Sequence, residues 1–233
     1  MNRHSLATLA AGAIVTLAST ATARADAKAF ALLKDAFDKL HAAQSVTMEL
    51  NIAMTPPEPA EPVVAKVRAT ALKPNFFRFD SKQPGLPSFI ADGKDYYTHW
   101  AGPNAFKKSE LAAAPTELPG LWEGEIDAFF GGMGKLKPAD VTLVGAEVVA
   151  EVPCDVVRVK LANPDRTITY AIGKADKVLR RARIELVDAA GLRMIQTTMI
   201  GTVKFDTDLK KSDFEFKPPA GAREVKDEPK PRA

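Results

Sequence analysis

The sequence has little of the chemistry from which metal and catalytic sites are built. Its 233 residues include one cysteine and three histidines, and it contains neither a Gly-x-Ser-x-Gly motif nor a glycine-rich phosphate loop. A zinc site needs three or four convergent ligands. His41 and His99 are far apart in sequence, and neither has a cysteine or carboxylate at ligand spacing. We therefore predict no metal ion and no cofactor.

An enzyme would need a nucleophile with a base, or two carboxylates, in one cleft. The closest approach is an acidic cluster formed by Glu123, Glu125 and Asp127. Acidic side chains are favoured near the N-terminus of a helix by the helix dipole, which explains this cluster more simply than catalysis does. We predict no catalytic residues and a protein that is not an enzyme.

Because Cys154 is the only cysteine, the chain cannot form an internal disulfide, and its core has to hold the fold unaided. The neighbours Val152-Pro153 and Asp155-Val156 place it near the start of a predicted strand. A buried, inert thiol is the simpler interpretation. A redox or nucleophilic role is the alternative.

No hydrophobic run approaches the ~20 apolar residues that a membrane span needs. The nearest is Leu6 to Leu17, which lies between Arg3 and the small-residue sequence Ala23-Arg24-Ala25. That order is typical of a secretory signal peptide. We predict that residues 1–25 are removed after Ala25 and that the rest is exported; an uncleaved anchor helix is the alternative.

Charge of neither sign dominates. The chain has 32 basic and 29 acidic residues. Cleavage after Ala25 would remove the basic residues Arg3 and Arg24, which leaves a formal charge of +1. This balance argues against a nucleic-acid partner and does not favour an anionic membrane surface. The remaining length suits one core, so we expect a monomer with a single domain over residues 26–225 and a disordered tail over 226–233.

The sequence does contain one clear helix and many strands. Ala27 to Ala43 carries apolar residues at helical spacing, which predicts an amphipathic helix lying across a sheet. Alternation with a period of two predicts about 10 or 11 antiparallel strands, and a sheet of that length tends to curl around its contents. Asp92-Gly93 and Gly191 are typical of hairpin turns. The predicted strands are 46–54, 63–71, 75–79, 89–91, 95–100, 141–149, 155–162, 166–172, 178–187, 192–205 and 213–216.

Residues 101–140 interrupt the alternation with prolines and glycines, which predicts a helical and loop insert. Short helices fit Lys108 to Ala113 and Glu123 to Phe130. Within the insert, Phe129, Phe130 and Met133 form an apolar cluster beside a glycine hinge. The cluster is either a movable flap or a plug for one end of the core.

Three segments, in matching order and spacing, resemble the bacterial periplasmic lipoprotein-carrier family. They are Ala69-Thr-Ala-Leu-Lys-Pro-Asn-Phe-Phe-Arg78, Ile90-Ala-Asp-Gly-Lys-Asp-Tyr-Tyr97 and Asp213-Phe-Glu-Phe-Lys-Pro-Pro-Ala-Gly-Ala222. The superfamily also contains the outer-membrane lipoprotein receptor and the sensor domain of an anti-sigma-factor regulator. Taken as a whole, the sequence resembles an uncharacterised family of predicted periplasmic proteins of this superfamily more than it resembles the carrier itself.

The resemblance implies a periplasmic protein with a curved, half-barrel antiparallel sheet, closed by the N-terminal helix and the insert around a hollow for acyl chains. In the carrier, an arginine before the shared proline helps to hold the lid shut. Here Lys73 stands at that position. Lysine lacks the planar fork of donors that arginine has, so the lid cannot be latched by the same bonds.

We therefore predict a non-catalytic binder, with a carrier role as one form of that function, whose concave sheet face holds a lipid, a lipoprotein acyl chain or another hydrophobic molecule. At ~0.8 kcal/mol per buried CH₂, a twelve-carbon chain would gain on the order of 9 kcal/mol before entropic costs. The alternatives are a dry core filled by the same side chains, or a module that docks a membrane-associated protein through its sheet edge or insert. The predicted lining residues are Met48, Leu50, Ile52, Phe77, Phe79, Phe89, Tyr97, Phe129, Phe130, Met133 and Met199.

Overall fold

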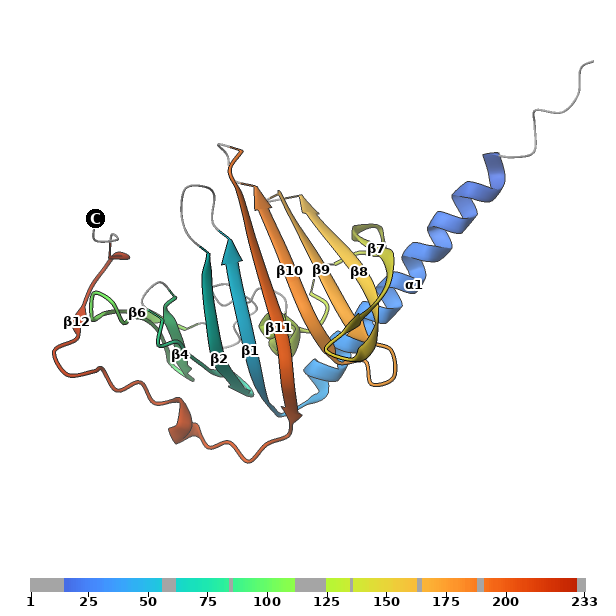
Figure 1. The fold of residues 1–233 in the computed structure, drawn as a ribbon. Coiled ribbons are helices and arrows are strands. Elements are labelled where there is room, and N and C mark those ends of the chain that lie inside the picture. The colour runs from blue at the N-terminus through green and yellow to red at the C-terminus, as the bar shows by residue number, and fades with distance from the viewer. Residues whose placement is uncertain are drawn as a thin grey trace, which may run out of the picture.

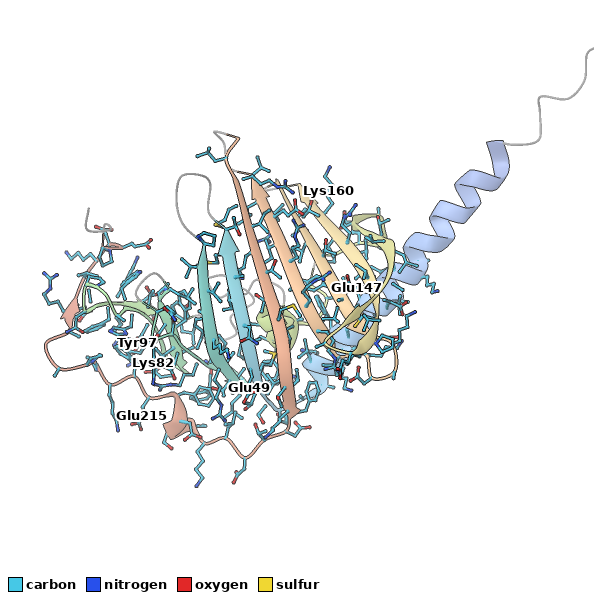
Figure 2. The ribbon with its side chains drawn as sticks, in the orientation of Figure 1. Glu49, Lys82, Tyr97, Glu147, Lys160 and Glu215 are labelled. Carbon is cyan, nitrogen blue, oxygen red and sulfur yellow. The ribbon has the colours of Figure 1, made fainter. Side chains whose placement is uncertain are left out.

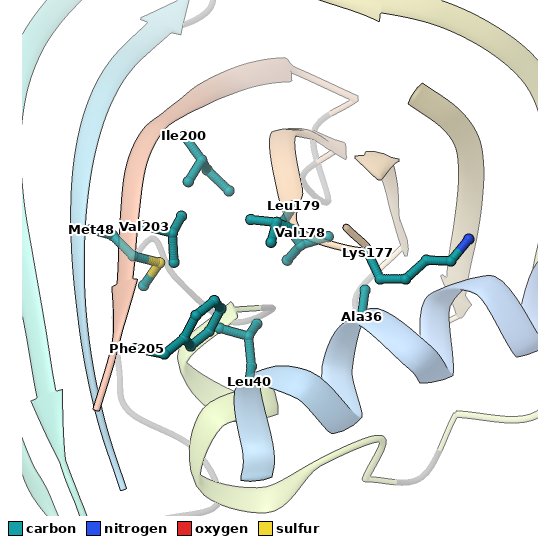
Figure 3. Close-up of a pocket in the computed structure, with 9 residues that line it drawn as sticks. All are labelled: Ala36, Leu40, Met48, Lys177, Val178, Leu179, Ile200, Val203 and Phe205. Atoms are coloured by element: carbon teal, nitrogen blue, oxygen red, sulfur yellow. The ribbon is translucent and has the colours of Figure 1, made fainter. Parts of the chain in front are cut away.

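In the computed structural model, the chain forms one large, open sheet that curves around a long helix (Figures 1 and 3). Twelve strands follow the order β12-β6-β5-β4-β3-β2-β1-β11-β10-β9-β8-β7, and every pair except β12–β6 is antiparallel. The predicted fold class, a curved half-barrel sheet with an N-terminal helix, is confirmed. The structure describes residues 15–55, 62–83, 86–111, 125–134, 136–162, 165–187 and 191–229.

The strands are shorter on one side of the sheet than on the other. The side near the C-terminus contains β3 to β6 and β12, and the other side contains the long strands. Their bounds are β1 Ser45–Thr55, β2 Val63–Leu72, β3 Phe76–Asp80, β4 Ser88–Asp92, β5 Asp95–Trp100, β6 Ala105–Glu110, β7 Val141–Val149, β8 Val152–Ala162, β9 Asp165–Gly173, β10 Leu179–Val187, β11 Arg193–Phe205 and β12 Arg223–Glu224.

The long helix α1, Val15–Ala42, begins within the segment predicted to be a signal peptide. Its first turns project beyond the sheet (Figure 1). Of its side chains that the structure describes, which start at Ala27, the first fully buried one is Ala29. Cleavage after Ala25 remains a prediction, and it would leave the part of α1 that covers the sheet. Among the described residues, no helix is both long and apolar enough to cross a membrane.

The sheet consists of two meanders that meet at one long strand pair. Strands β1 to β6 pair in chain order, as do β7 to β11, and β1 pairs with β11 from Val46↔Phe205 to Thr55↔Ile195. Two predicted turns are present, since Gly93 and Gly191 both have positive φ. A Cβ at Gly93 would lie 2.6 Å from the ring of Phe76, so only glycine fits this turn.

The core follows from the alternation along each strand. In β1, Val46, Met48, Leu50 and Ile52 are at most 2% exposed, whereas Glu49 between them is exposed. Side chains of successive residues point to opposite faces of a sheet, so one face carries the apolar set. This concave face holds α1 and the short helix α2, Glu125–Gly131. The alanines of β2 are buried as well, so the room above them is occupied.

The predicted insert is partly wrong, because residues 105–110 form strand β6. Lys108 to Glu110, predicted as the start of a helix, pair with Tyr97 to Asp95 of β5 instead. The second predicted helix is present as α2, while residues 112–124 lie outside the described part. A short 3₁₀ turn, η1 (Pro138–Asp140), then leads into β7.

The predicted last strand at 213–216 is also wrong. Residues 206–229, here called the C-terminal strap, contain a 3₁₀ turn, η2 (Lys211–Phe214), run across the convex face of β3 to β6 and form the short edge strand β12 beside β6. Phe214 packs 5.7 Å from the ring of Phe76, and Phe216 stacks on Tyr97 at 4.7 Å. The outer face of these strands carries Phe76, Tyr97 and Phe106, and burying these rings under Phe214 and Phe216 stabilises the strap on the sheet.

We expect Phe37→Ala in α1 to destabilise the fold strongly. Phe37 is 3% exposed, and its ring packs edge-on against Tyr170 with centroids 5.6 Å apart. Removing a buried phenylalanine ring typically costs about 3–5 kcal/mol. Urea unfolding should show a loss of that size, whereas the exposed neighbour Asp35→Ala should change stability by less than about 0.5 kcal/mol. Equal effects of the two substitutions would contradict the packing.

The strap should also make stability depend on pH through His99. Burial lowers the pKa of His99 below its usual value, and Phe216 of the strap lies 6.1 Å from its ring. The unfolded state therefore takes up a proton first, so stability falls as the pH drops below about 6.5. An NMR titration of the wild-type protein should give a lowered pKa for His99, and in Phe216→Ala this pKa should return toward its usual value. If the pKa of His99 is the same in the variant and the wild type, the strap does not shield this side chain.

Candidate binding site on the concave face

The centre of the concave face is filled by the protein itself. Most of the predicted lining residues there belong to one core cluster with residues of α1 and α2. Among the described residues this part of the sheet is packed as core, and its role as a ligand lining remains a prediction. Phe130 and Met133 are partly buried against the same core. The predicted lining residues that are at most 6% exposed are Met48, Leu50, Ile52, Phe77, Phe79, Phe89 and Phe129.

Beneath α1 the described residues enclose a very small pocket (Figure 3). Ala36 and Leu40 of the helix face Met48, Ile200 and Val203 of the sheet across it. Its volume is about 10 Å³, which is at the lower limit for one water molecule. The side chains around it therefore act as core, and no ligand fits there without a movement of α1.

A larger space lies at the other end of the same face, over β4 to β6. Its volume is about 300 Å³, and we call it the aromatic hollow. Among the described residues, helix α1 packs mainly against α2 and β7 to β9, and its main contacts do not include β4 to β6. The residues that line the aromatic hollow are Pro87, Phe89, Tyr96, Thr98, Trp100, Lys107, Ser109 and Glu228.

The lining combines an aromatic floor with a few polar groups. The rings of Phe89 and Tyr96 are stacked, with centroids 6.1 Å apart and an angle of 18° between their planes. Burial raises the pKa of Tyr96 far above its usual value, so its phenol stays neutral. Lys107 and Glu228 supply charges at the wall. An apolar pocket with a small number of polar anchors suits a hydrophobic ligand.

Two predicted lining residues, Tyr97 and Met199, lie on the opposite face. Tyr97 follows the inward-facing Tyr96, so it points outward, where burial under Phe216 raises its pKa. Met199 pairs with Asn51 and packs against a second, smaller cluster that includes Cys154. A bulge in the β1–β11 pairing brings both Ile200 and Val203 to the concave side, which simple alternation does not predict.

Lys73 contacts both helices that close the concave face. Its Nζ donates a hydrogen bond to the carbonyl of His41 at the end of α1 and lies 5.5 Å from the ring centroid of Phe129 in α2. Nδ1 of His41 is 3.2 Å from the carbonyl oxygen of Phe129. These contacts tie α2 to α1 and to the turn before β3. The role of Lys73 in a lid remains a prediction.

The sequence prediction missed most of the aromatic hollow because it chose Tyr97 instead of Tyr96 on β5 and did not recognise β6. Lys107 and Ser109 come from that strand, and Thr98 and Trp100 face them from β5. The inward side of β6 is polar, so it lacks the apolar alternation by which strands are found. The turn residues Gly102-Pro103-Asn104 directly after β5 were the available signal for a hairpin.

Nothing in the described part of the chain brings three or more histidine, cysteine or acidic side chains together as a metal site. Cys154 is fully buried, and its Sγ donates to the carbonyl of Val152 at 3.3 Å. Burial also raises the pKa of its thiol. A buried thiol with a raised pKa is a poor nucleophile, which agrees with the inert interpretation.

We expect Cys154 to react with Ellman's reagent only when the protein unfolds. At pH 8 the guanidinium-unfolded protein should release one equivalent of thionitrobenzoate, and in the same time the native protein should release almost none. In the native protein, burial keeps the reagent away from the thiol and suppresses formation of the thiolate. Complete labelling of the native protein at the rate of a free thiol would contradict this burial.

No protein-family model matches the sequence, and no curated protein sequence resembles it significantly. Solved structures are similar to it at low identity. An uncharacterized conserved protein from Thermus thermophilus is 15% identical, with 86% of this chain and 99% of that chain covered and a TM-score of 0.53. A DUF1329 family protein from Desulfovibrio piger is 10% identical, with 80% and 97% covered and a TM-score of 0.42.

A LolA superfamily protein from Nitrosomonas europaea is 14% identical, with 81% of this chain and 97% of that chain covered and a TM-score of 0.41. Structures of the kinds that the sequence resemblance predicts, a LolA superfamily protein and a DUF1329 family protein, are thus among those with a similar fold. At such identities the likeness is one of fold alone.

Proposed function

We propose that this protein is a non-catalytic, periplasmic binder of a hydrophobic ligand, such as a lipid or an acyl chain, and that the aromatic hollow is its binding site. The observation that carries the proposal is the position of the hollow. It lies on the apolar face of the sheet at the β4–β6 end, which the main contacts of α1 do not include among the described residues. The carrier-like segments and the predicted signal peptide support the compartment.

The size of the aromatic hollow limits the ligand. Ligand pockets in proteins usually have volumes of roughly 300–1,000 Å³, and the hollow, at about 300 Å³, lies at the lower end. It suits one acyl chain or one small lipophilic molecule rather than a complete phospholipid.

The polar side chains suit one end of an amphipathic ligand. Lys107 offers a positive charge, while Thr98 and Ser109 offer hydroxyl groups on the adjacent strands. The three side chains come from the same face of β5 and β6, and Phe89 and Tyr96 lie beyond them on β4 and β5. An acyl chain on the rings with a polar end near Lys107 would satisfy both parts of the lining.

Native mass spectrometry of delipidated protein incubated with bacterial lipids tests the proposal. We expect one ligand per wild-type chain. Ser109→Trp should fill the hollow and reduce the bound fraction at least about tenfold, because a bulky ring would occupy the ligand's volume. The control Glu110→Trp places the same ring on the opposite face of β6 and should bind as the wild type does. Lipid-free wild-type protein, or equal binding by both variants, would refute the hollow as the site.

A docking module is the second candidate, because β7 is an edge strand with exposed apolar side chains. Val144 is 46% and Val148 69% exposed, and in the described part of the chain β7 pairs with β8 alone. Such an edge can accept a strand from a partner. This function would be favoured if the purified chain binds no lipid in the same experiment but captures one partner protein from a membrane extract.

A further inference from the structure

The convex face of the long strands carries a charge that the composition does not reveal. The strap covers the convex face of β3 to β6 but not that of β2, β1 and β11 to β7 (Figure 1). Eight basic and three acidic described side chains point outward there, an excess of five positive charges in a chain with 32 basic and 29 acidic residues. The basic ones are Lys66, Arg68, Arg158, Lys160, Arg181, Arg183, Arg193 and Lys204, and the acidic ones are Glu49, Glu147 and Glu185.

Three of the arginines surround a shallow groove of about 300 Å³. Arg183, Thr169 and Arg158 lie side by side on β10, β9 and β8, so the backbones of the two arginines are roughly 10 Å apart. Arg181 is the next outward residue of β10, and the hydroxyl of Thr169 lies between the arginines on the floor. The groove therefore gathers guanidinium groups from two strands around one small space.

The ion pairs of this face leave part of its donor capacity unused. Nη2 of Arg181 is 2.6 Å from Oε1 of Glu147, and Arg183 pairs with Glu185. Arg158 is exposed and has no carboxylate partner among the described residues. The buried Nε of Arg181 also lacks an acceptor there. Arginine presents a planar fork of donors that matches a phosphate group, so the groove is suited to a phosphate.

We propose that this face docks on an anionic phospholipid bilayer and that the groove takes a lipid phosphate. A bilayer presents many phosphates side by side, so basic residues outside the groove, such as Lys160 at the upper end of β8 (Figure 2), can be engaged together with it. Val144 lines the groove and is 46% exposed, which suits the apolar part of a membrane interface better than an acidic peptide. This docking does not depend on the aromatic hollow.

Co-sedimentation with vesicles tests the proposal. Wild-type protein should bind vesicles of phosphatidylethanolamine and phosphatidylglycerol, but not phosphatidylcholine vesicles, and binding should weaken as salt screens the charges. The double variant Arg158→Glu/Lys160→Glu reverses two exposed charges beside the groove. We expect its affinity for the anionic vesicles to fall by at least about tenfold. Its circular dichroism and thermal unfolding should match those of the wild type.

A matched control changes the net charge equally at another place. Lys217→Glu/Lys226→Glu alters two exposed residues of the strap and should bind the vesicles as the wild type does. The proposal would be overturned by wild-type protein that does not sediment with anionic vesicles at low salt, or by equal losses in the two double variants. It would also be overturned by a polyglutamate peptide that binds as tightly as the vesicles, since the partner would then be an acidic protein.

Discussion

The pairing of β1 with β11 is the contact on which the rest of the fold depends. It joins residues as far apart as Val46 and Phe205, and without it the two meanders would be separate sheets, each with an uncovered apolar face. Ile200 of β11 and Leu50 of β1 belong to one core through this pair. Long-range pairs of this kind have a high entropic cost of closure, which the shared core beneath α1 and α2 has to offset.

Because the helices cover only part of that joined face, the concave side has two different halves. Among the described residues, the pocket beneath α1 has room for about one water molecule, and the space over β4 to β6 has a volume of about 300 Å³. Lys73 stands near the boundary, where it contacts both helices. The described part of this sheet thus leaves a space at one end, while its packed centre provides stability.

The same alternation that builds the core also segregates the charges. Residues that point away from the core on the long strands are mostly basic or hydroxyl-bearing, whereas many carboxylates lie on α1, in the turns and along the strap. A nearly balanced chain therefore acquires a positive convex face. Two surfaces with different chemistry, one apolar and concave and one basic and convex, lie on opposite sides of one sheet.

The sequence by itself determined the helix over 27–42, the two hairpin turns at Gly93 and Gly191, and most strands, since these depend on local periodicity and turn chemistry. It also indicated the buried thiol and the superfamily resemblance. Only the tertiary structure decided which apolar residues face an open space, because Phe77 and Phe89 have the same local pattern but different neighbours above them. The polar strand β6, the course of the strap and the grouping of Arg158 with Arg183 likewise depend on contacts between distant segments, which no local pattern encodes.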